Sequence, residues 1–181
     1  LICAVEHGHD VIIPDGSFVP QNGDIITLVA SPQSAKRFFE KLNVKTKPVR
    51  NVIIVGGGTI AYYLTKELLK HGIDVKLIDN NFKRCEELSE MLPEANILCG
   101  DGTDRQFLLN EGITTAEAVV TLTNIDEENI ILSLFSRKHS RAKVVTKINR
   151  LEYDDILEGL DVGSVIYPKY LTCDYIMQYV R

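Results

Sequence analysis

Three consecutive glycines, Gly56 to Gly58, lie between an apolar run and an amphipathic stretch of the sequence. With Ala61 they fit the pattern GxGxxG/A, in which Gly56 permits a tight turn and Gly58 leaves room for a phosphate. Ala61 would let the following helix pack closely on the strand. The N–H groups at the start of such a helix attract anions. The motif therefore predicts a phosphate-binding loop.

An acidic residue, Asp79, closes the apolar run that comes next. Its spacing from the glycines is close to the roughly 20 residues at which an acid accepts the hydroxyl groups of a ribose. A carboxylate at this position would repel the 2′-phosphate of NADP by about 4 kcal/mol, for charges ~4 Å apart at an effective dielectric constant of ~20. The glycines and the acid together predict a site for NAD(H) or an adenine nucleotide.

The same residues also allow a purely structural interpretation. The glycines could only form a turn while Asp79 only caps the next helix. Lys83 and Arg84 could reach a phosphate, but a charged helix face favours solvated side chains at both positions. Because the loop and the acid fall in one strand–helix–strand unit, as the fingerprint requires, the nucleotide site is the preferred interpretation.

Two polar loops, residues 99–103 and 123–129, follow the third and fourth apolar runs of this part of the chain. Ligands of open α/β sheets bind beyond the carboxyl ends of strands. Asp101 could therefore accept a hydrogen bond from an adenine amino group, and Thr123 could bind a second ribose or a phosphate. Asp101 and Asp126 could instead cap helices, which we prefer for Asp126 and leave open for Asp101.

The elements that must position these residues alternate regularly from Val49 onward. Six apolar runs occur at 49–55, 74–79, 96–99, 117–122, 143–149 and 164–168. Five amphipathic stretches separate them, at 59–72, 82–92, 103–112, 126–139 and 152–160. Such alternation predicts right-handed crossovers and an α/β fold, a Rossmann-like doubly wound parallel sheet of six strands. A further helix is expected over 170–181.

The first part of the chain has a different pattern. Short β runs at 1–6, 10–14 and 24–30 alternate with turn clusters, which predicts a small β-rich unit. A short helix follows at 33–42, with Phe38, Phe39 and Leu42 expected on one buried face. Polar residues 43–48 read as a linker, so we divide the chain into domains at 1–45 and 46–181.

Composition excludes several classes of protein. With 181 residues, 45% of them hydrophobic, the chain can form a globular core. The net charge of −5 argues against general affinity for nucleic acid. The four cysteines match no zinc spacing, which predicts reduced thiols and no metal site. No apolar run approaches the roughly 20 residues that span a bilayer, so any membrane role is expected to act through a partner.

The motifs GGGTIA, LIDNN, CGDGTD, TLTNIDEEN and VVTKINR, in this order, resemble the regulatory nucleotide-binding domain family called RCK or KTN. Within it, the chain is most similar to the second repeat of the tandem Trk-type (TrkA) regulators of potassium uptake, from residue 49 to the end. The segment AVEHGHDVIIPDGSFVPQNGDIITLVAS resembles the closing part of the small C-terminal RCK (TrkA-C) subdomain. The resemblance thus implies a piece of a longer protein, with a partial TrkA-C-like subdomain at 1–45 and a TrkA-N domain at 46–181.

The resemblance implies a regulatory subunit that binds NAD(H), or else ATP or ADP. Such a subunit is cytoplasmic, peripheral to the inner face of the cell membrane, and forms a dimer or ring beneath a membrane potassium transporter. Matching motif positions implies nucleotide contacts at Gly56, Gly58, Thr59, Ile60, Asp79, Asn80, Gly100, Asp101, Thr123 and Lys147. Two departures, Thr59 where many relatives have arginine and Lys169 where some ATP-binding relatives have glutamate, put a triphosphate-specific response in doubt.

An alternative class is an NAD-dependent oxidoreductase fragment. Tyr62 and Lys66 spell the YxxxK pair of short-chain dehydrogenases, but they lie on the helix after the phosphate loop, where packing of Tyr62 and Tyr63 is expected instead. None of the four histidines has an orienting partner that the sequence identifies, so we predict no catalytic residue and no enzyme. A third class is a bare interaction module, since aromatic and apolar residues of the last helix, such as Tyr175, favour a dimer.

Overall fold

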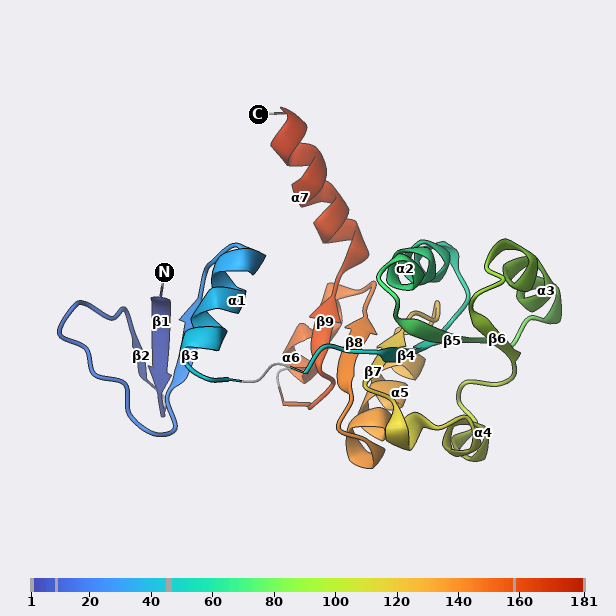
Figure 1. Ribbon diagram of the computed structural model, residues 1–181, viewed down its shortest axis with the longest axis horizontal. Coiled ribbons are helices and arrows are strands. Elements are labelled where there is room, and N and C mark those ends of the chain that lie inside the picture. The colour runs from blue at the N-terminus through green and yellow to red at the C-terminus, as the bar shows by residue number, and fades with distance from the viewer. Residues whose placement is uncertain (1, 9, 45–46, 158, 181) are drawn as a thin grey trace. The chain divides into compact units, whose positions relative to one another are not determined.

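The computed structural model describes residues 2–8, 10–44, 47–157 and 159–180 (Figure 1). The chain separates into two compact units, Leu1–Pro48 and Val49–Arg181, and each is described by itself. The predicted domain boundary between residues 45 and 46 lies outside the described residues. So do residue 1 of the first predicted strand, residue 158 of a predicted helix and residue 181 of the last one.

The first unit is a three-stranded antiparallel sheet followed by a helix, as the β runs and the helical pattern predict. Its strands, in the order β2-β1-β3, are β1 Ile2–His7, β2 Asp10–Ile12 and β3 Ile25–Leu28, and its helix is α1 Pro32–Lys41. Ser31 begins the helix by accepting a hydrogen bond from the Ser34 amide. The prediction for Leu42 is wrong, because this residue ends the helix and is 57% exposed, whereas Phe38 and Phe39 are half-buried.

The second unit contains a six-stranded parallel sheet, which confirms the predicted Rossmann-like doubly wound fold. Its strands are β4 Asn51–Val55, β5 Asp74–Asp79, β6 Asn96–Cys99, β7 Ala118–Thr121, β8 Lys143–Lys147 and β9 Ser164–Ile166. They lie in the order β6-β5-β4-β7-β8-β9. The chain therefore winds outward from β4 in both directions, and the order reverses between β4 and β7. In open α/β sheets, ligands bind at this switch point, beyond the carboxyl ends of the strands.

Helices connect the strands and cover both faces of the sheet, and one further helix, α7, follows the last strand (Figure 1). They are α2 Thr59–Lys70, α3 Phe82–Met91, α4 Arg105–Asn110, α5 Asp126–His139, α6 Asp154–Leu157 and α7 Pro168–Val180. Short 3₁₀ turns occur at Ile113–Thr115 and Leu151–Tyr153. Two helices differ most from the prediction: α4 begins only after its N-cap Asp104, and the predicted helix over 152–160 is divided between a 3₁₀ turn and α6.

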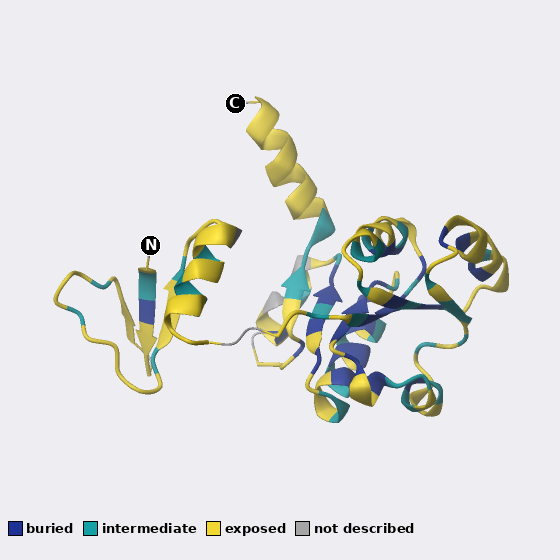
Figure 2. Cartoon of the chain, in the orientation of Figure 1, coloured by how far each residue is buried: buried dark blue, intermediate teal, exposed yellow. Residues whose placement is uncertain are grey.

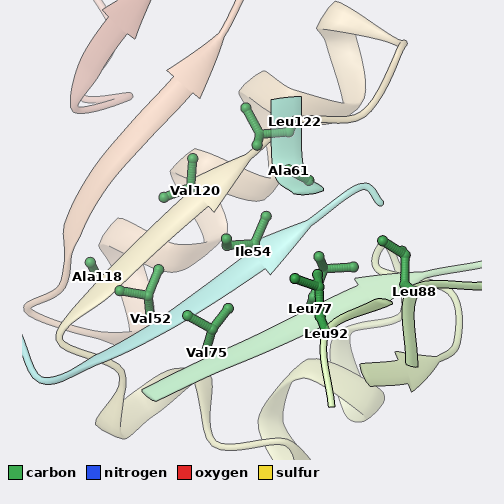
Figure 3. Close-up of a cluster of buried hydrophobic side chains, with 10 residues drawn as sticks. All are labelled: Val52, Ile54, Ala61, Val75, Leu77, Leu88, Leu92, Ala118, Val120 and Leu122. Carbon is green, nitrogen blue, oxygen red and sulfur yellow. The ribbon is translucent and has the colours of Figure 1, made fainter. Parts of the chain in front are cut away.

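The central strand β4 is buried on both faces of the sheet. Val52 and Ile54 belong to a hydrophobic cluster that includes residues of α2 and α3 (Figure 3), while Ile53 and Val55 belong to a second cluster that includes residues of α4 and α5. Complete burial of one such side chain stabilises a fold by about 1.5–3 kcal/mol. Strong anchoring of β4 on both sides fixes the position of the glycine loop that follows it.

The last helix, α7, buries none of its described side chains (Figure 2). Its exposed apolar and aromatic residues are Tyr170, Leu171, Tyr175, Ile176, Met177, Tyr179 and Val180. The apolar surface of α7 is thus left uncovered by the second unit.

Within the described stretches of the chain, no helix combines the length and the apolar character needed to cross a membrane.

Candidate functional site

The glycine loop between β4 and α2 is tight at its first two positions and open at the third. Gly56 has a φ of +103°, and a Cβ there would lie 2.7 Å from the carbonyl carbon of Leu122. At Gly57 a Cβ would lie 2.7 Å from a methyl group of Leu88. At Gly58, the N-cap of α2, a Cβ would meet no described atom within 4 Å. The loop is therefore held close to its neighbours, with free space in front of the helix.

Asp79, at the end of β5, is joined to this loop by a direct hydrogen bond. Its Oδ2 accepts from the Gly57 amide at 2.7 Å, and its Oδ1 accepts from the Asn81 amide at 2.8 Å. The capping alternative for Asp79 is wrong, because the N-cap of α3 is Asn81, which accepts from the Arg84 amide at 3.1 Å. The carboxylate instead links the glycine loop to the turn before α3.

Arg84 departs from the prediction that it is solvated. Its side chain is 28% exposed, and its Nε donates to the Gly57 carbonyl at 2.7 Å. Its Nη1 also pairs with Glu87 at 3.1 Å. The neighbouring Lys83 is exposed, as predicted. Asp79 thus holds the amide of Gly57 and Arg84 holds its carbonyl, which the sequence pattern did not reveal.

A cavity of about 230 Å³ lies at the carboxyl ends of β4, β5 and β7, at the switch point of the sheet. Five of the predicted contact residues line it: Gly56, Gly58, Asp79, Asn80 and Thr123. The other five do not: Thr59, Ile60, Gly100, Asp101 and Lys147. Sequence reasoning missed further lining residues, namely Gly57, Gly102, Thr103, Asn124 and Ile125. These residues lie in loops that the sequence had already indicated as ligand-binding. Their position in those loops is the signal that could have identified them.

In the loop after β6, the Asp101 side chain accepts hydrogen bonds within its own turn and does not cap a helix. Its Oδ1 accepts from the Thr103 hydroxyl at 2.7 Å and from the Thr103 amide at 2.8 Å, and these bonds lower the pKa of Asp101. The capping alternative for Asp101 is wrong, because Asp104 caps α4. A Cβ at Gly100 would lie 2.5 Å from the ring of Phe107, so this glycine makes room for that ring. Thr103 is therefore held at the cavity wall.

Thr123, after β7, has its polar groups engaged with the loop and with α5. Its hydroxyl lies 3.0 Å from the Ile125 carbonyl oxygen and 2.9 Å from Asn129 Oδ1. Asn129 is fully buried, and its Nδ2 donates both to the Thr123 carbonyl at 3.1 Å and to the Lys147 carbonyl at 3.0 Å. Asn129 thereby fixes the loop that forms one wall of the cavity. The sequence placed it in a polar loop but did not single it out.

The preferred prediction that Asp126 caps α5 is wrong. The N-cap position is Ile125, and Asp126 is the first helical residue, with 2% exposure. Its carboxylate accepts from the Asn149 amide and side chain, at 3.0 and 2.8 Å, and from the Arg150 amide at 3.1 Å. The buried carboxylate thus joins α5 to the segment that follows β8, a contact between residues far apart in the sequence.

Lys147, at the end of β8, is buried below the cavity wall. Its Nζ donates to the Leu122 carbonyl at 3.3 Å. Burial lowers the pKa of Lys147, and the negative charge of Asp126 opposes that shift. Because its ammonium group is turned toward the backbone at the end of β7, Lys147 supports the cavity and does not line it.

The residues that an oxidoreductase would use are not assembled at the cavity. Tyr62 packs against the core, but Tyr63 is 64% exposed, so the expectation that both pack holds for Tyr62 alone. The expectation that no histidine has an orienting partner is wrong for His7, whose Nδ1 lies 2.6 Å from Asp24 Oδ1 in the first unit. Across the described residues, no group of three or more histidine, cysteine or acidic side chains could hold a metal ion.

Comparison with known proteins gives a family match over most of the second unit. The family model of the TrkA-N domain matches residues 52–168. The Trk system potassium uptake protein TrkA of Vibrio alginolyticus is 33% identical over 170 residues, which cover 94% of this chain and 37% of that protein. This chain therefore spans less than half the length of that curated relative.

Solved structures share the fold at low sequence identity. The TrkA-N domain of the inner membrane protein ybaL from Escherichia coli has a TM-score of 0.64 and 14% identity, covering 75% of this chain and all of that one (100%). A structure described as the GsuK channel bound to NAD has a TM-score of 0.58 and 16% identity, covering 74% of this chain and 25% of that chain. These likenesses concern the fold.

Proposed function

This chain belongs to the TrkA-N domain family, and on that premise we propose that its switch-point cavity binds NAD(H) or an adenine nucleotide. The observation that carries the proposal is the bond between Asp79 and the Gly57 amide, which brings a ribose-binding acid and a phosphate loop into one cavity. One solved structure of similar fold is described as the GsuK channel bound to NAD, and this supports the same class of ligand.

The phosphates lie against Gly58 in this proposal, because space is open there and the N-terminus of α2 follows directly. Each oxygen of Asp79 already accepts one backbone hydrogen bond and keeps a further lone pair for a ribose hydroxyl. Asn80, after β5, and Thr123, after β7, line the same cavity from the two strands that flank β4. The charge of Asp79 favours NAD(H) over NADP(H).

A whole dinucleotide extends beyond the cavity itself. Its volume of about 230 Å³ is below the roughly 300–1,000 Å³ of typical ligand pockets. Direct contact in the cavity is therefore proposed for the five predicted residues that line it. The part of the ligand that extends beyond the cavity would contact the outer predicted residues, Thr59, Ile60, Gly100 and Asp101. Lys147 would act indirectly, through its hydrogen bond to the Leu122 carbonyl.

For the whole protein, the function proposed is regulation of potassium uptake, because the V. alginolyticus relative is a Trk system potassium uptake protein. Residues 1–45 form part of an RCK C-terminal subdomain and residues 46–181 the nucleotide-binding domain. The chain works at the cytoplasmic side of a membrane transporter subunit, and the exposed apolar face of α7 supports self-association as a dimer or ring. In this proposal the regulatory subunit has two conformations. A nucleotide that binds one of them more tightly increases its population and so gates the transporter.

Parallel calorimetric titrations with NADH, NADPH, ADP and ATP test the ligand class. We expect NADH or ADP to bind and NADPH to bind at least tenfold more weakly than NADH, a difference of about 1.4 kcal/mol. Absence of heat with all four nucleotides would overturn the proposed site. Because a regulator holds its ligand unchanged, NADH absorbance should stay constant with the protein and candidate carbonyl substrates; steady consumption would favour the oxidoreductase class instead.

A further inference from the structure

Two cysteines, Cys85 and Cys99, lie near the carboxyl edge of the sheet. Cys99 is the last residue of β6, and Cys85 lies one turn into α3. After burial, the neighbouring Cys99 is the largest influence that raises the pKa of the Cys85 thiol. Side chains alternate along a strand, and Ile97, two residues before Cys99, packs against the hydrophobic cluster to which Leu88 of α3 belongs. Cys99 therefore faces the side of the sheet that α3 covers.

Contacts with two carbonyl groups place the Cys85 sulfur beside the end of β5 and the Leu98–Cys99 peptide of β6. Cys85 Sγ lies 3.4 Å from the Asp79 carbonyl oxygen and 3.9 Å from the Leu98 carbonyl oxygen. The Gly100 amide donates to that same Asp79 oxygen at 2.9 Å. The Cys85 sulfur therefore lies beside the ends of β5 and β6, close to the residues on either side of Cys99.

The two thiols differ in access to solvent. Cys99 is exposed, whereas Cys85 is buried, with 7% exposure. Burial, followed by the influence of the neighbouring Cys99, raises the pKa of the Cys85 thiol to about 11. Cys85 consequently keeps its proton near neutral pH, and a soluble oxidant reaches Cys99 first.

We propose that Cys99 and Cys85 form a redox modification site in which a hydroperoxide converts the pair to a disulfide. In the first step the Cys99 thiolate attacks the peroxide, the O–O bond breaks, and the products are a Cys99 sulfenic acid and, after protonation, an alcohol or water. In the second step the Cys85 sulfur attacks the Cys99 sulfur, the S–O bond breaks, and water leaves with the Cys85 proton. Both cysteines are oxidised and the peroxide is reduced.

Peptide mapping of the whole chain after treatment with hydrogen peroxide tests this site. In the wild type we expect one linked peptide pair joining Cys85 to Cys99, with the loss of two hydrogen atoms, which dithiothreitol reverses. The matched control Cys173→Ser, at an exposed cysteine of α7, should retain the linkage, and Cys99→Ser should lose it. In Cys85→Ser, a sulfenic acid at Cys99 should become trappable by dimedone.

Three results would overturn the proposal. One is a wild type in which Cys85 stays alkylatable after denaturation while Cys99 proceeds to sulfinic acid. Another is a wild type in which both thiols stay reduced under peroxide that oxidises Cys173. The third is a linkage between chains, seen as a dimer on a non-reducing gel. Because the wild-type map decides among these outcomes, the test does not depend on whether a cysteine variant folds.

Discussion

The Oδ2 atom of Asp79 accepts a hydrogen bond from the Gly57 amide at 2.7 Å, so the acid that ends β5 is bound directly to the middle of the glycine loop. The Gly57 carbonyl is held in turn by Arg84 Nε at 2.7 Å. Both backbone polar groups of Gly57 are therefore fixed by neighbouring side chains. The loop is ordered before any ligand arrives, and preorganisation of this kind lowers the cost of binding.

The glycines should separate folding from binding. Gly56→Ala should lower the free energy of unfolding by about 2 kcal/mol or more, because its φ is positive and the new methyl group would press on the Leu122 backbone. Gly58→Ala should change stability by less than about 1 kcal/mol, since the space there is open, yet weaken nucleotide binding at least tenfold. Urea denaturation and calorimetry measure the two quantities. Equal effects of both variants on stability would contradict this assignment.

Asn129 should be essential to the wall of the cavity. Asn129→Ala removes the partners of the Thr123 amide and of the Thr123 and Lys147 carbonyls, so stability should fall by about 3 kcal/mol. The matched control is Asn124→Ala, an exposed residue of the same loop, which should stay within about 0.5 kcal/mol of the wild type. Chemical denaturation compares them. A loss at Asn129 no larger than at Asn124 would show that its hydrogen bonds are not needed.

Glu127 should give the protein a pH dependence at acid pH. The Tyr153 hydroxyl donates to Glu127, and with Arg150 it lowers the pKa of that carboxyl from its ordinary 4.5 to about 2. Because the pKa is lower in the folded state, the carboxylate stabilises the fold above pH ~4.5, and this contribution is lost as the pH falls toward ~2.

The variant Glu127→Gln should therefore melt below the wild type near neutral pH, and the difference in melting temperature should shrink between pH ~5 and ~2. High salt should reduce the difference as well, since the cluster is exposed. Glu90→Gln, at an exposed position on α3, serves as the control. Thermal melts at several pH values decide the matter. A gap between Glu127→Gln and wild type that stays constant over this range would contradict the lowered pKa.

Thr65 on α2 offers a stabilising substitution. Its hydroxyl is fully buried and makes no hydrogen bond among the described residues. Thr65→Val should therefore raise the free energy of unfolding by about 1 kcal/mol. Thr146→Val is the opposite case, because that hydroxyl donates to the Val162 carbonyl at 2.6 Å, and stability should fall. Denaturant midpoints measure both; a loss of stability at Thr65 would reveal a partner for its hydroxyl.

The strand–turn–helix unit around the glycine loop was predictable from the sequence because its signals are local. A continuous apolar run such as 52–55 indicates a strand buried on both faces, and the glycines after it indicate the turn. The parallel sheet of six strands followed from the regular alternation of apolar runs and amphipathic stretches, whereas the order of the strands was not predicted. Gly56, Gly58, Asp79 and Thr123 were predictable because the carboxyl ends of neighbouring parallel strands meet at one edge, whereas Asn80 was predicted from the family resemblance alone.

The contacts that the sequence did not reveal are those that join distant segments. Arg84 and Gly57 are 27 residues apart, and Asp126 and Asn149 are 23 apart. An acid before a helix looks the same in sequence whether it caps that helix or bonds to another segment. Similarly, His7 meets Asp24 only because β1 and β3 are paired. Such pairings depend on tertiary placement, which hydrophobic periodicity does not encode.

The most direct test of the nucleotide site is calorimetric titration of NADH into the wild type, Asp79→Ala and the matched control Asp74→Ala. Asp74 begins the same strand that Asp79 ends, so both variants remove one carboxylate from β5. We expect Asp74→Ala to bind as the wild type does and Asp79→Ala to bind at least tenfold more weakly while still unfolding cooperatively. Unchanged affinity in a folded Asp79→Ala protein would contradict the account.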